Sequence, residues 1–273
     1  MRLFSFSIIV LISLAFSCSS PDKKAEVQKR TKVEMTTDFG TIVLELYNET
    51  PKHRDNFIKI VKDGVLDSVL FHRVIENFMI QGGDINSKNA SPTDTLGNGD
   101  LGYLVDAEFD TALFHKKGVL AAARSGNPAR ASSSTQFYIT QGKILNDSLL
   151  DRAETRINGW LLENYVINLP ENKELLDAFN KAVEDEDWLA YEEVMGKVKE
   201  IGEKTEFKKY RIPEHQREVY KTIGGTPHLD QNYTVFGEVV SGLEVVDSIA
   251  ATQTGPFDRP IQDIRILKIR IVE

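Results

Sequence analysis

The chain has 273 residues, of which 41% are hydrophobic and 27% are charged, and its 33 basic and 41 acidic side chains give a net charge of −8. This balance excludes a polytopic membrane protein, which is more apolar, and a fully disordered chain, which is more polar. The net negative charge argues against nucleic acid as a partner, because phosphate contacts need a basic face. The length suffices for one large domain or two small ones.

The N-terminal residues predict export. Arg2 is followed by residues 3–16, which are apolar apart from three serines and are too few to span a bilayer, for which roughly 20 are needed. Residues 1–17 are therefore interpreted as a signal peptide. The segment that ends in Ser17-Cys18 resembles the lipobox of bacterial lipoproteins, in which the cysteine is lipidated and becomes the new N-terminus. The alternative is an ordinary signal peptide with an incidental cysteine.

Cys18 is the only cysteine of the chain, which excludes an intramolecular disulfide and a cysteine-based metal site. Residues 18–32 are polar and cannot bury enough surface to order themselves, so we expect a lipidated cysteine followed by a flexible tether. Such an anchor would hold the protein at a membrane of the bacterial cell envelope, facing the periplasm or the cell surface. We expect the protein to be a monomer.

The folded part is expected to begin at residue 33 with a β-hairpin. Residues 33–36 and 41–47 alternate between apolar and polar side chains, and a tight turn at Asp38-Phe39-Gly40 joins them. Thr50-Pro51 then predicts a helix with Thr50 as its N-cap and Pro51 at the first helical position. Asp63-Gly64 is expected to end that helix.

The remaining β-type segments are short and are separated by Gly, Asn, Asp and Ser, which indicates a barrel or a sandwich. Gly242 introduces a short amphipathic helix, and the alternation of the last strand shifts phase near Ile266, where we expect a β-bulge. The expected strands lie in residues 71–75, 78–81, 118–123, 136–140, 234–240 and 264–272.

Residues 143–221 differ from the rest, because apolar side chains recur there at spacings of three and four. This period predicts three or four amphipathic helices inserted into the β-domain of residues 33–273. We expect a separate bundle with its own small core, to which Trp160 and Trp188 contribute most. Such a bundle is expected to be dispensable for the chemistry and to take part in the choice of client. The alternative is a spacer that contributes only to stability.

The usual catalytic patterns are absent from the sequence: it has no phosphate-binding loop, no nucleophile elbow and no paired metal ligands. One unusual segment, residues 71–84, places Arg73 and Gln81 in an otherwise apolar stretch. On neighbouring strands these two side chains could face a pocket above Phe78 and Met79. An arginine in such a place needs partners or a function, unless it reaches to the surface.

This segment, FHRVIENFMIQGGD, resembles the signature of the cyclophilins, a family of peptidyl-prolyl cis-trans isomerases. Similar matches follow in the family's order at residues 118–124, 134–139 and 228–237. The resemblance covers roughly residues 33–141 and 222–273. It implies a mainly-β fold, namely an eight-stranded antiparallel β-barrel capped by two helices, with the helical segment as an insertion.

The resemblance also implies roles for individual residues. Arg73 matches the catalytic arginine of the family, and Gln81 matches the glutamine beside it. Three positions depart from common family residues, because Tyr138 stands for Phe, Tyr233 for His and His228 for Trp. The implied substrate-binding residues are Phe78, Met79, Tyr138 and Leu229 around the proline ring, together with His72, Ala123, Arg124, Gln136, His228 and Tyr233.

The implied reaction needs neither a nucleophile nor a cofactor. Rotation about the C–N bond of a peptide has a barrier of about 18–20 kcal/mol, which comes from the double-bond character of that bond. An isomerase lowers it by binding the twisted state, in which the proline nitrogen regains its lone pair and can accept a hydrogen bond from Arg73.

The expected partners are proline-containing polypeptides and unfolded exported proteins. The main alternative is a non-catalytic chaperone of the cell envelope that holds proline peptides or unfolded clients, with the helical segment as its main client surface. A structural lipoprotein of the envelope is a third alternative, and no feature of the sequence supports it.

Overall fold

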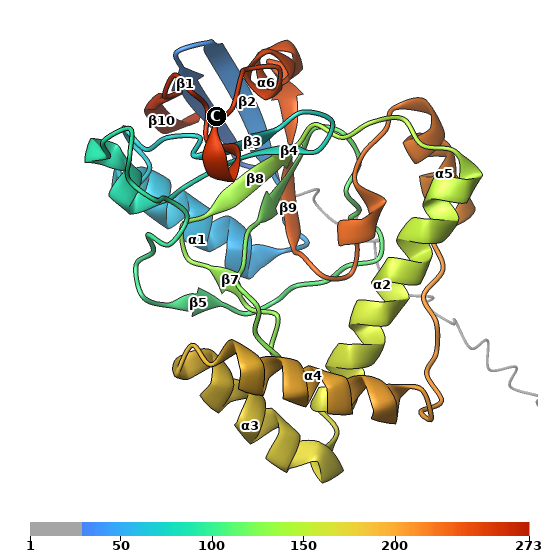
Figure 1. Cartoon of the computed structure of the whole chain (residues 1–273). Coiled ribbons are helices and arrows are strands. Elements are labelled where there is room, and N and C mark those ends of the chain that lie inside the picture. The colour runs from blue at the N-terminus through green and yellow to red at the C-terminus, as the bar shows by residue number, and fades with distance from the viewer. Residues whose placement is uncertain (1–28, 273) are drawn as a thin grey trace, which may run out of the picture.

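The computed structural model describes residues 29–272, and its centre is a curled antiparallel sheet of eight strands (Figure 1). A second, two-stranded sheet lies beside it and pairs β5 (Leu104–Val105) with β7 (Ser132–Ser133). In spatial order, the strands of the large sheet are β10 (Ile266–Val272), β1 (Lys32–Thr37), β2 (Gly40–Leu46), β9 (Val235–Ser241), β6 (Val119–Ala122), β8 (Phe137–Thr140), β4 (Met79–Gly82) and β3 (Arg73–Ile75).

The curl brings the two edges of the large sheet together. Residues 68–71, which lie directly before β3, exchange backbone hydrogen bonds with residues 264–266 at the start of β10. Helices α1 (Pro51–Lys62) and α6 (Leu243–Ala250) pack their apolar faces onto the core inside the curl. The predicted mainly-β, eight-stranded antiparallel fold with two capping helices is therefore confirmed.

The first hairpin follows the sequence pattern. Its turn needs a glycine, because Gly40 has a φ of 131° and an added Cβ would lie 3.0 Å from a methyl group of Val245. The predicted bulge in β10 is present as well. Thr36 pairs with Lys268 and Thr37 pairs with Ile266, which leaves Leu267 as the extra residue.

Helix α1 begins at Pro51 as predicted, but Thr50 does not cap it with its side chain. The backbone N–H groups of Lys52 and His53 instead donate to the carboxylate of Glu108, each over 3.0 Å. The ring of His53 contacts the same carboxylate at 2.7 Å. The free N–H groups at the start of the helix are thus satisfied by a residue more than fifty positions away.

The folded domain begins before residue 33. Strand β1 starts at Lys32, and Arg30 forms an ion pair with Glu49 at 2.8 Å and stacks over the ring of Tyr47 at 4.5 Å. The end of the expected tether therefore contacts the barrel. The predicted signal peptide, Cys18 and the tether up to residue 28 lie outside the described residues.

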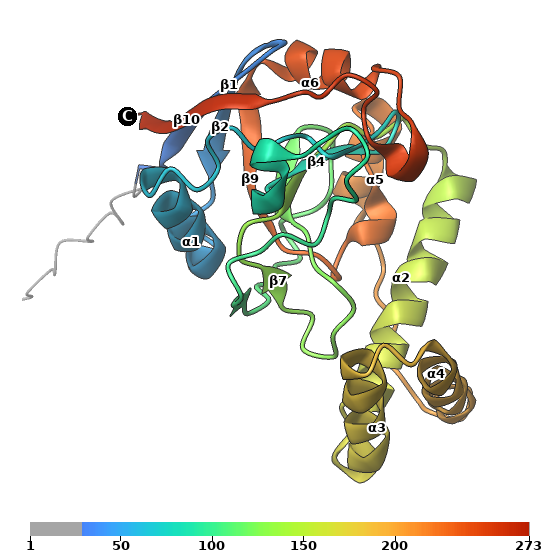
Figure 2. The ribbon, with the colours of Figure 1, turned by 60° about the vertical axis from the view of Figure 1, so that its left-hand side comes forward.

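The insertion contains four helices, in agreement with the sequence pattern (Figure 2). The helices are α2 (Asp147–Ile167), α3 (Lys173–Glu184), α4 (Trp188–Gly202) and α5 (Glu214–Thr222).

The insertion is not held by one core of its own. The end of α2 packs with α3 and α4 in an outer cluster that includes Val166, Phe179 and Val198. The first half of α2 packs with Tyr220 of α5 in a second cluster, which Phe114 of the β-domain joins. The expected separate bundle is therefore correct only for the outer half.

The expectation that two tryptophans form the core of the insertion is also wrong. Trp188 is 64% exposed at the start of α4. Trp160 packs instead against the apolar cluster of the β-domain that contains Met79, Tyr138 and Leu229. Helical periodicity identifies the apolar positions of a helix, but it does not identify the surface that covers each of them.

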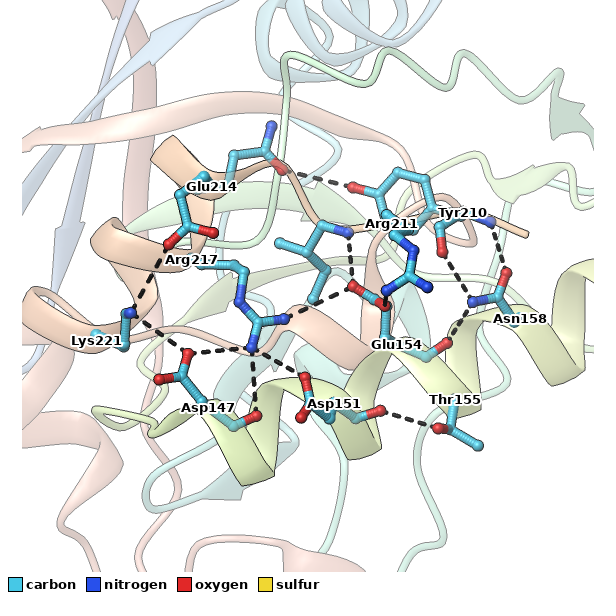
Figure 3. A network of polar contacts seen from close by, with 12 residues as sticks. Asp147, Asp151, Glu154, Thr155, Asn158, Tyr210, Arg211, Glu214, Arg217 and Lys221 are labelled. Carbon is cyan, nitrogen blue, oxygen red and sulfur yellow. Dashed lines mark hydrogen bonds and ion pairs between the residues drawn. The ribbon is translucent and has the colours of Figure 1, made fainter. Parts of the chain in front are cut away.

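A network of ion pairs holds α5 against α2 (Figure 3). Arg217 lies among three carboxylates of α2, at 2.9 Å from Asp151, 3.1 Å from Asp147 and 3.7 Å from Glu154. Glu154 also accepts a hydrogen bond from the backbone N–H of Ile212 over 2.9 Å. Single exposed ion pairs contribute little, but this set fixes both α5 and the segment directly before it onto α2.

Within residues 29–272, no helix combines the length and the apolar character that crossing a membrane requires.

Candidate active site

The residues of the candidate site lie in one row across three strands. Arg73 of β3 pairs with Gln81 of β4, and Gln81 pairs with Tyr138 of β8. Side chains that are directly opposite in antiparallel strands lie on the same face of a sheet, so these three share one face. Met79 shares that face because it lies two positions from Gln81.

The row lines a hollow of about 170 Å³. Its other walls come from the two residues after β6, from the short helix η3 (Pro227–Leu229) and from the segment after η3. All nine lining residues were predicted from the sequence. They are Arg73, Phe78, Met79, Gln81, Ala123, Arg124, Tyr138, Leu229 and Tyr233.

Arg73 stands at the wet edge of the hollow. Its side chain is 42% exposed, and its Nε lies 3.3 Å from a carboxylate oxygen of Asp258. Asp258 belongs to the short helix η4 (Pro256–Asp258) and has a φ of 59°. Within the described residues, the two terminal nitrogens of Arg73 have no hydrogen-bond partner, so they can donate to a ligand. No sequence pattern indicates the contact between Arg73 and Asp258.

Gln81 is oriented by a second amide. Its Nε2 donates to Oε1 of Gln136 over 3.2 Å, and Nε2 of Gln136 donates to the carbonyl oxygens of Gly97 and Gly99. Gln136 is buried, so this chain of bonds fixes the direction of both amides. Gln136 therefore lies beside the hollow, behind Gln81.

Arg124 and Tyr233 form a wall on the side of the insertion. The guanidinium of Arg124 donates to the backbone oxygen of Asn232 over 3.0 Å and to its side-chain oxygen over 2.7 Å. It also lies 4.9 Å from the ring centre of Tyr233, and that ring meets Tyr138 edge to face. Burial lowers the pKa of Arg124 from its usual value.

Tyr138 ends a buried chain of hydrogen bonds that reaches the insertion. Its hydroxyl lies 2.9 Å from Nε2 of His115, and Nδ1 of His115 lies 2.8 Å from Asp230. The other oxygen of Asp230 accepts from the hydroxyl of Tyr220 on α5 over 2.7 Å. A carboxylate only accepts, so Nδ1 of His115 carries a proton, and Nε2 of a neutral ring accepts from Tyr138. Burial raises the pKa of Tyr138 well above its usual value.

Two predicted histidines lie around the hollow and do not line it. His228 stacks on Phe78 with ring centres 5.6 Å apart, and burial lowers its pKa to about 4. His72 is 4% exposed and lies behind Arg73, against a larger cavity shared with η4. Burial also lowers the pKa of His72 to about 4. Both rings are therefore neutral at pH 7.

Among residues 29–272, no three or more His, Cys, Asp or Glu side chains are grouped in a way that could hold a metal ion.

Comparison with known proteins identifies the family. The family model described as "Cyclophilin type peptidyl-prolyl cis-trans isomerase/CLD" matches residues 32–200 and 215–271. A relative from Staphylococcus aureus (strain USA300), named "Putative peptidyl-prolyl cis-trans isomerase", is 31% identical over 257 residues, which cover 93% of this chain and 98% of the relative. The chain belongs to the cyclophilin-type peptidyl-prolyl cis-trans isomerases.

Further similarities agree with this assignment. A relative of the same name from Staphylococcus saprophyticus is 30% identical over 245 residues, which cover 89% of this cyclophilin and 92% of the relative. A crystal structure of a cyclophilin-type isomerase from Cryptosporidium parvum has the same fold, with a TM-score of 0.54, 18% identity and coverage of 89% of this chain and 98% of the other. A second structure of that protein, in the presence of the dipeptide Ala-Pro, has a TM-score of 0.51.

Sequence reasoning missed the residues behind the walls of this cyclophilin's site. His115 contacts Tyr138 and Asp258 contacts Arg73, while Tyr220 is linked to Tyr138 only through Asp230 and His115. One signal was available for His115 and Tyr220. Tyr138 stands where many members have Phe, and a buried tyrosine hydroxyl generally needs a hydrogen-bond partner.

We expect acid to destabilise this cyclophilin through His72. The pKa of His72 is about 4 in the folded chain and near 6.5 in an unfolded one. Above about pH 6.5, His72 is neutral in both states and the free energy of unfolding does not depend on its protonation. As the pH falls from about 6.5 toward 4, only the unfolded chain binds this proton, so the free energy of unfolding decreases by up to about 1.4 kcal/mol per pH unit. The variant His72→Phe should show a shallower loss in urea unfolding from about pH 7 to about pH 4.5.

His215→Phe is the matched control, because it replaces an exposed histidine on α5. It should leave the pH dependence of the wild type unchanged. Equal pH dependence in wild type and His72→Phe would contradict the expectation.

Proposed function

We propose that the hollow beside Arg73 binds the proline ring of a client and accelerates rotation about the X–Pro bond during the folding of exported proteins, without a cofactor. One observation carries this proposal: Arg73 and Gln81, paired across β3 and β4, meet an apolar wall in a hollow of about 170 Å³. This combination supplies a place for the ring and a donor beside its nitrogen.

The proposed mechanism is preferential binding of the twisted peptide bond. Phe78, Met79 and Leu229 hold the proline ring by apolar contact. As the C–N bond twists, it loses its double-bond character, and the nitrogen gains a lone pair. A terminal nitrogen of Arg73 then donates to that lone pair, so the hydrogen bond forms in the transition state and not in the planar ground state.

Asp258 is proposed to aim Arg73. It contacts only Nε, which leaves the outer edge of the guanidinium facing the hollow. Gln81, held by Gln136, would orient the substrate beside it.

Replacing Arg73 with Ala should lower kcat/KM for a short X–Pro peptide by about 10²–10³, because one donor aimed at developing charge is worth this much. Arg73→Lys should restore little, since an ammonium group lacks the planar fork of donors. The measurement is a proline-isomerisation assay on residues 19–273.

Arg211→Ala is the control for this experiment, because the side chain of Arg211 is 86% exposed and does not line the hollow. It should leave the rate unchanged. Near wild-type turnover in a folded Arg73→Ala protein would show that the proposed role of Arg73 is wrong.

We also propose that the protein is a lipoprotein of the bacterial cell envelope, anchored through Cys18. The proposal rests on the sequence alone: a short apolar stretch ends at Ser17-Cys18, and a polar segment follows. A single acyl chain binds a membrane only marginally, whereas two or more chains on one residue anchor it stably.

The variant Cys18→Ser should either remain unprocessed or appear in the soluble fraction, because the anchor cannot form. Membrane fractionation of cells that express the two proteins measures this. Ser19→Ala is the neighbouring control and should fractionate as the wild type does. Fractionation of Cys18→Ser with membranes at its mature mass would contradict the proposal.

A further inference from the structure

A second hollow of about 270 Å³ adjoins the proline site on the side of the insertion. The two hollows share Arg124 and Tyr233 as a common wall. A polypeptide that leaves the proline site over this wall therefore enters the second hollow, which we name the insertion groove.

The walls of the insertion groove come from two parts of the chain. The β-domain supplies Gly126 and Pro128, in the loop after β6. The insertion supplies a predominantly apolar wall from three helices: Trp160 and Ile167 of α2, Phe179 of α3, and Tyr191 and Met195 of α4.

Two hydrogen bonds tie the walls together. The side-chain nitrogens of Asn164 and Asn168, both at the end of α2, donate to the backbone oxygen of Pro128 over 2.6 and 3.2 Å. The groove is thus built into the folded chain. Trp160 strengthens this link, because it contacts the apolar cluster that contains Met79 and Leu229 of the proline site.

The lining of the groove, rather than its charges, favours an apolar occupant. Arg124 is bonded to Asn232, and Arg130 donates to the carbonyl of Gln231 over 2.8 Å. Glu163, whose pKa is raised by burial, lines the groove together with these two arginines. The groove thus contains charged groups of both signs, whereas most of the side chains that the insertion contributes are apolar.

We propose that the insertion groove binds a client residue near the isomerised X–Pro bond, and that it prefers a large apolar side chain. The inference rests on the proposed function of the proline site. The volume of the insertion groove, about 270 Å³, is just below the range of small-ligand sites, about 300–1,000 Å³. This size suits one large side chain. The insertion then selects clients through a defined subsite that is continuous with the proline site.

The test uses the full mature chain and three peptides. The first is a four-residue peptide with one X–Pro bond. The second is a twelve-residue peptide with the same central residues, flanked on both sides by Leu and Phe. The third has Gln at those flanking positions, so that charge does not enter the comparison. We expect kcat/KM for the apolar long peptide to exceed that for the polar one by about tenfold, mainly through KM, because burial of one large apolar side chain gives at least this factor.

Two variants alter the groove without touching the proline site. Met195→Gln keeps the length of the side chain and makes it polar. Gly126→Trp fills the groove, since an added Cβ at Gly126 meets nothing within 4 Å. Both should abolish the preference for the apolar peptide and leave turnover of the four-residue peptide unchanged. Leu189→Gln is the matched control, because Leu189 lies on the same helix as Met195 and is 81% exposed.

The outcomes separate the two proposals. Equal kcat/KM for the two long peptides in the wild type would overturn the insertion groove, as would equal effects of Met195→Gln and Leu189→Gln. Failure of the wild type to isomerise the four-residue peptide would overturn the proposed function instead.

Discussion

The buried carboxylate of Asp230 is the constraint on which the rest of this structure depends. It accepts from the backbone and the ring of His115, each over 2.8 Å, and from Tyr220 over 2.7 Å, at 1% exposure. A charge so deeply buried is tolerated only when hydrogen bonds satisfy it. Because Asp230 directly follows Leu229, its bonds also fix the apolar wall of the proline site. The same group thus holds the site, the β-domain and α5 of the insertion in one arrangement.

This arrangement divides the site into a dry side and a wet side. On the dry side, Tyr138 is buried and bonded to His115, and its ring keeps an apolar surface toward the hollow. On the wet side, Arg73 is 42% exposed, with Asp258 on its Nε. The proposed mechanism uses both sides, because an apolar surface holds the proline ring while a charged donor stays close to its nitrogen. The insertion groove continues the dry side beyond Tyr233.

The sequence predicted the parts of this fold that depend on local patterns. Alternation along residues 41–47 correctly indicated β2. The phase shift near Ile266, in the last strand, correctly indicated the bulge in β10. The resemblance of one long motif to the cyclophilins placed Arg73 and Gln81 at one site, and their pairing in the structure agrees. Contacts between distant segments had no such pattern. Asp258 lies 185 residues from Arg73, and Glu108, rather than Thr50, satisfies the start of α1. The exposure of Trp188 depends on which surfaces meet in three dimensions, which helical periodicity does not encode.

The central claim is that the wall of the proline site and the insertion form one hydrogen-bonded unit through His115 and Asp230. A double-mutant cycle of Tyr138→Phe and Tyr220→Phe, read as free energies of unfolding in urea, tests it most directly. Residues in one buried network couple by about 0.5–3 kcal/mol, so the double variant should differ from the sum of the single variants by an energy in this range. Additivity within about 0.3 kcal/mol, as for independent sites, would show that the two tyrosines act separately and would contradict the account.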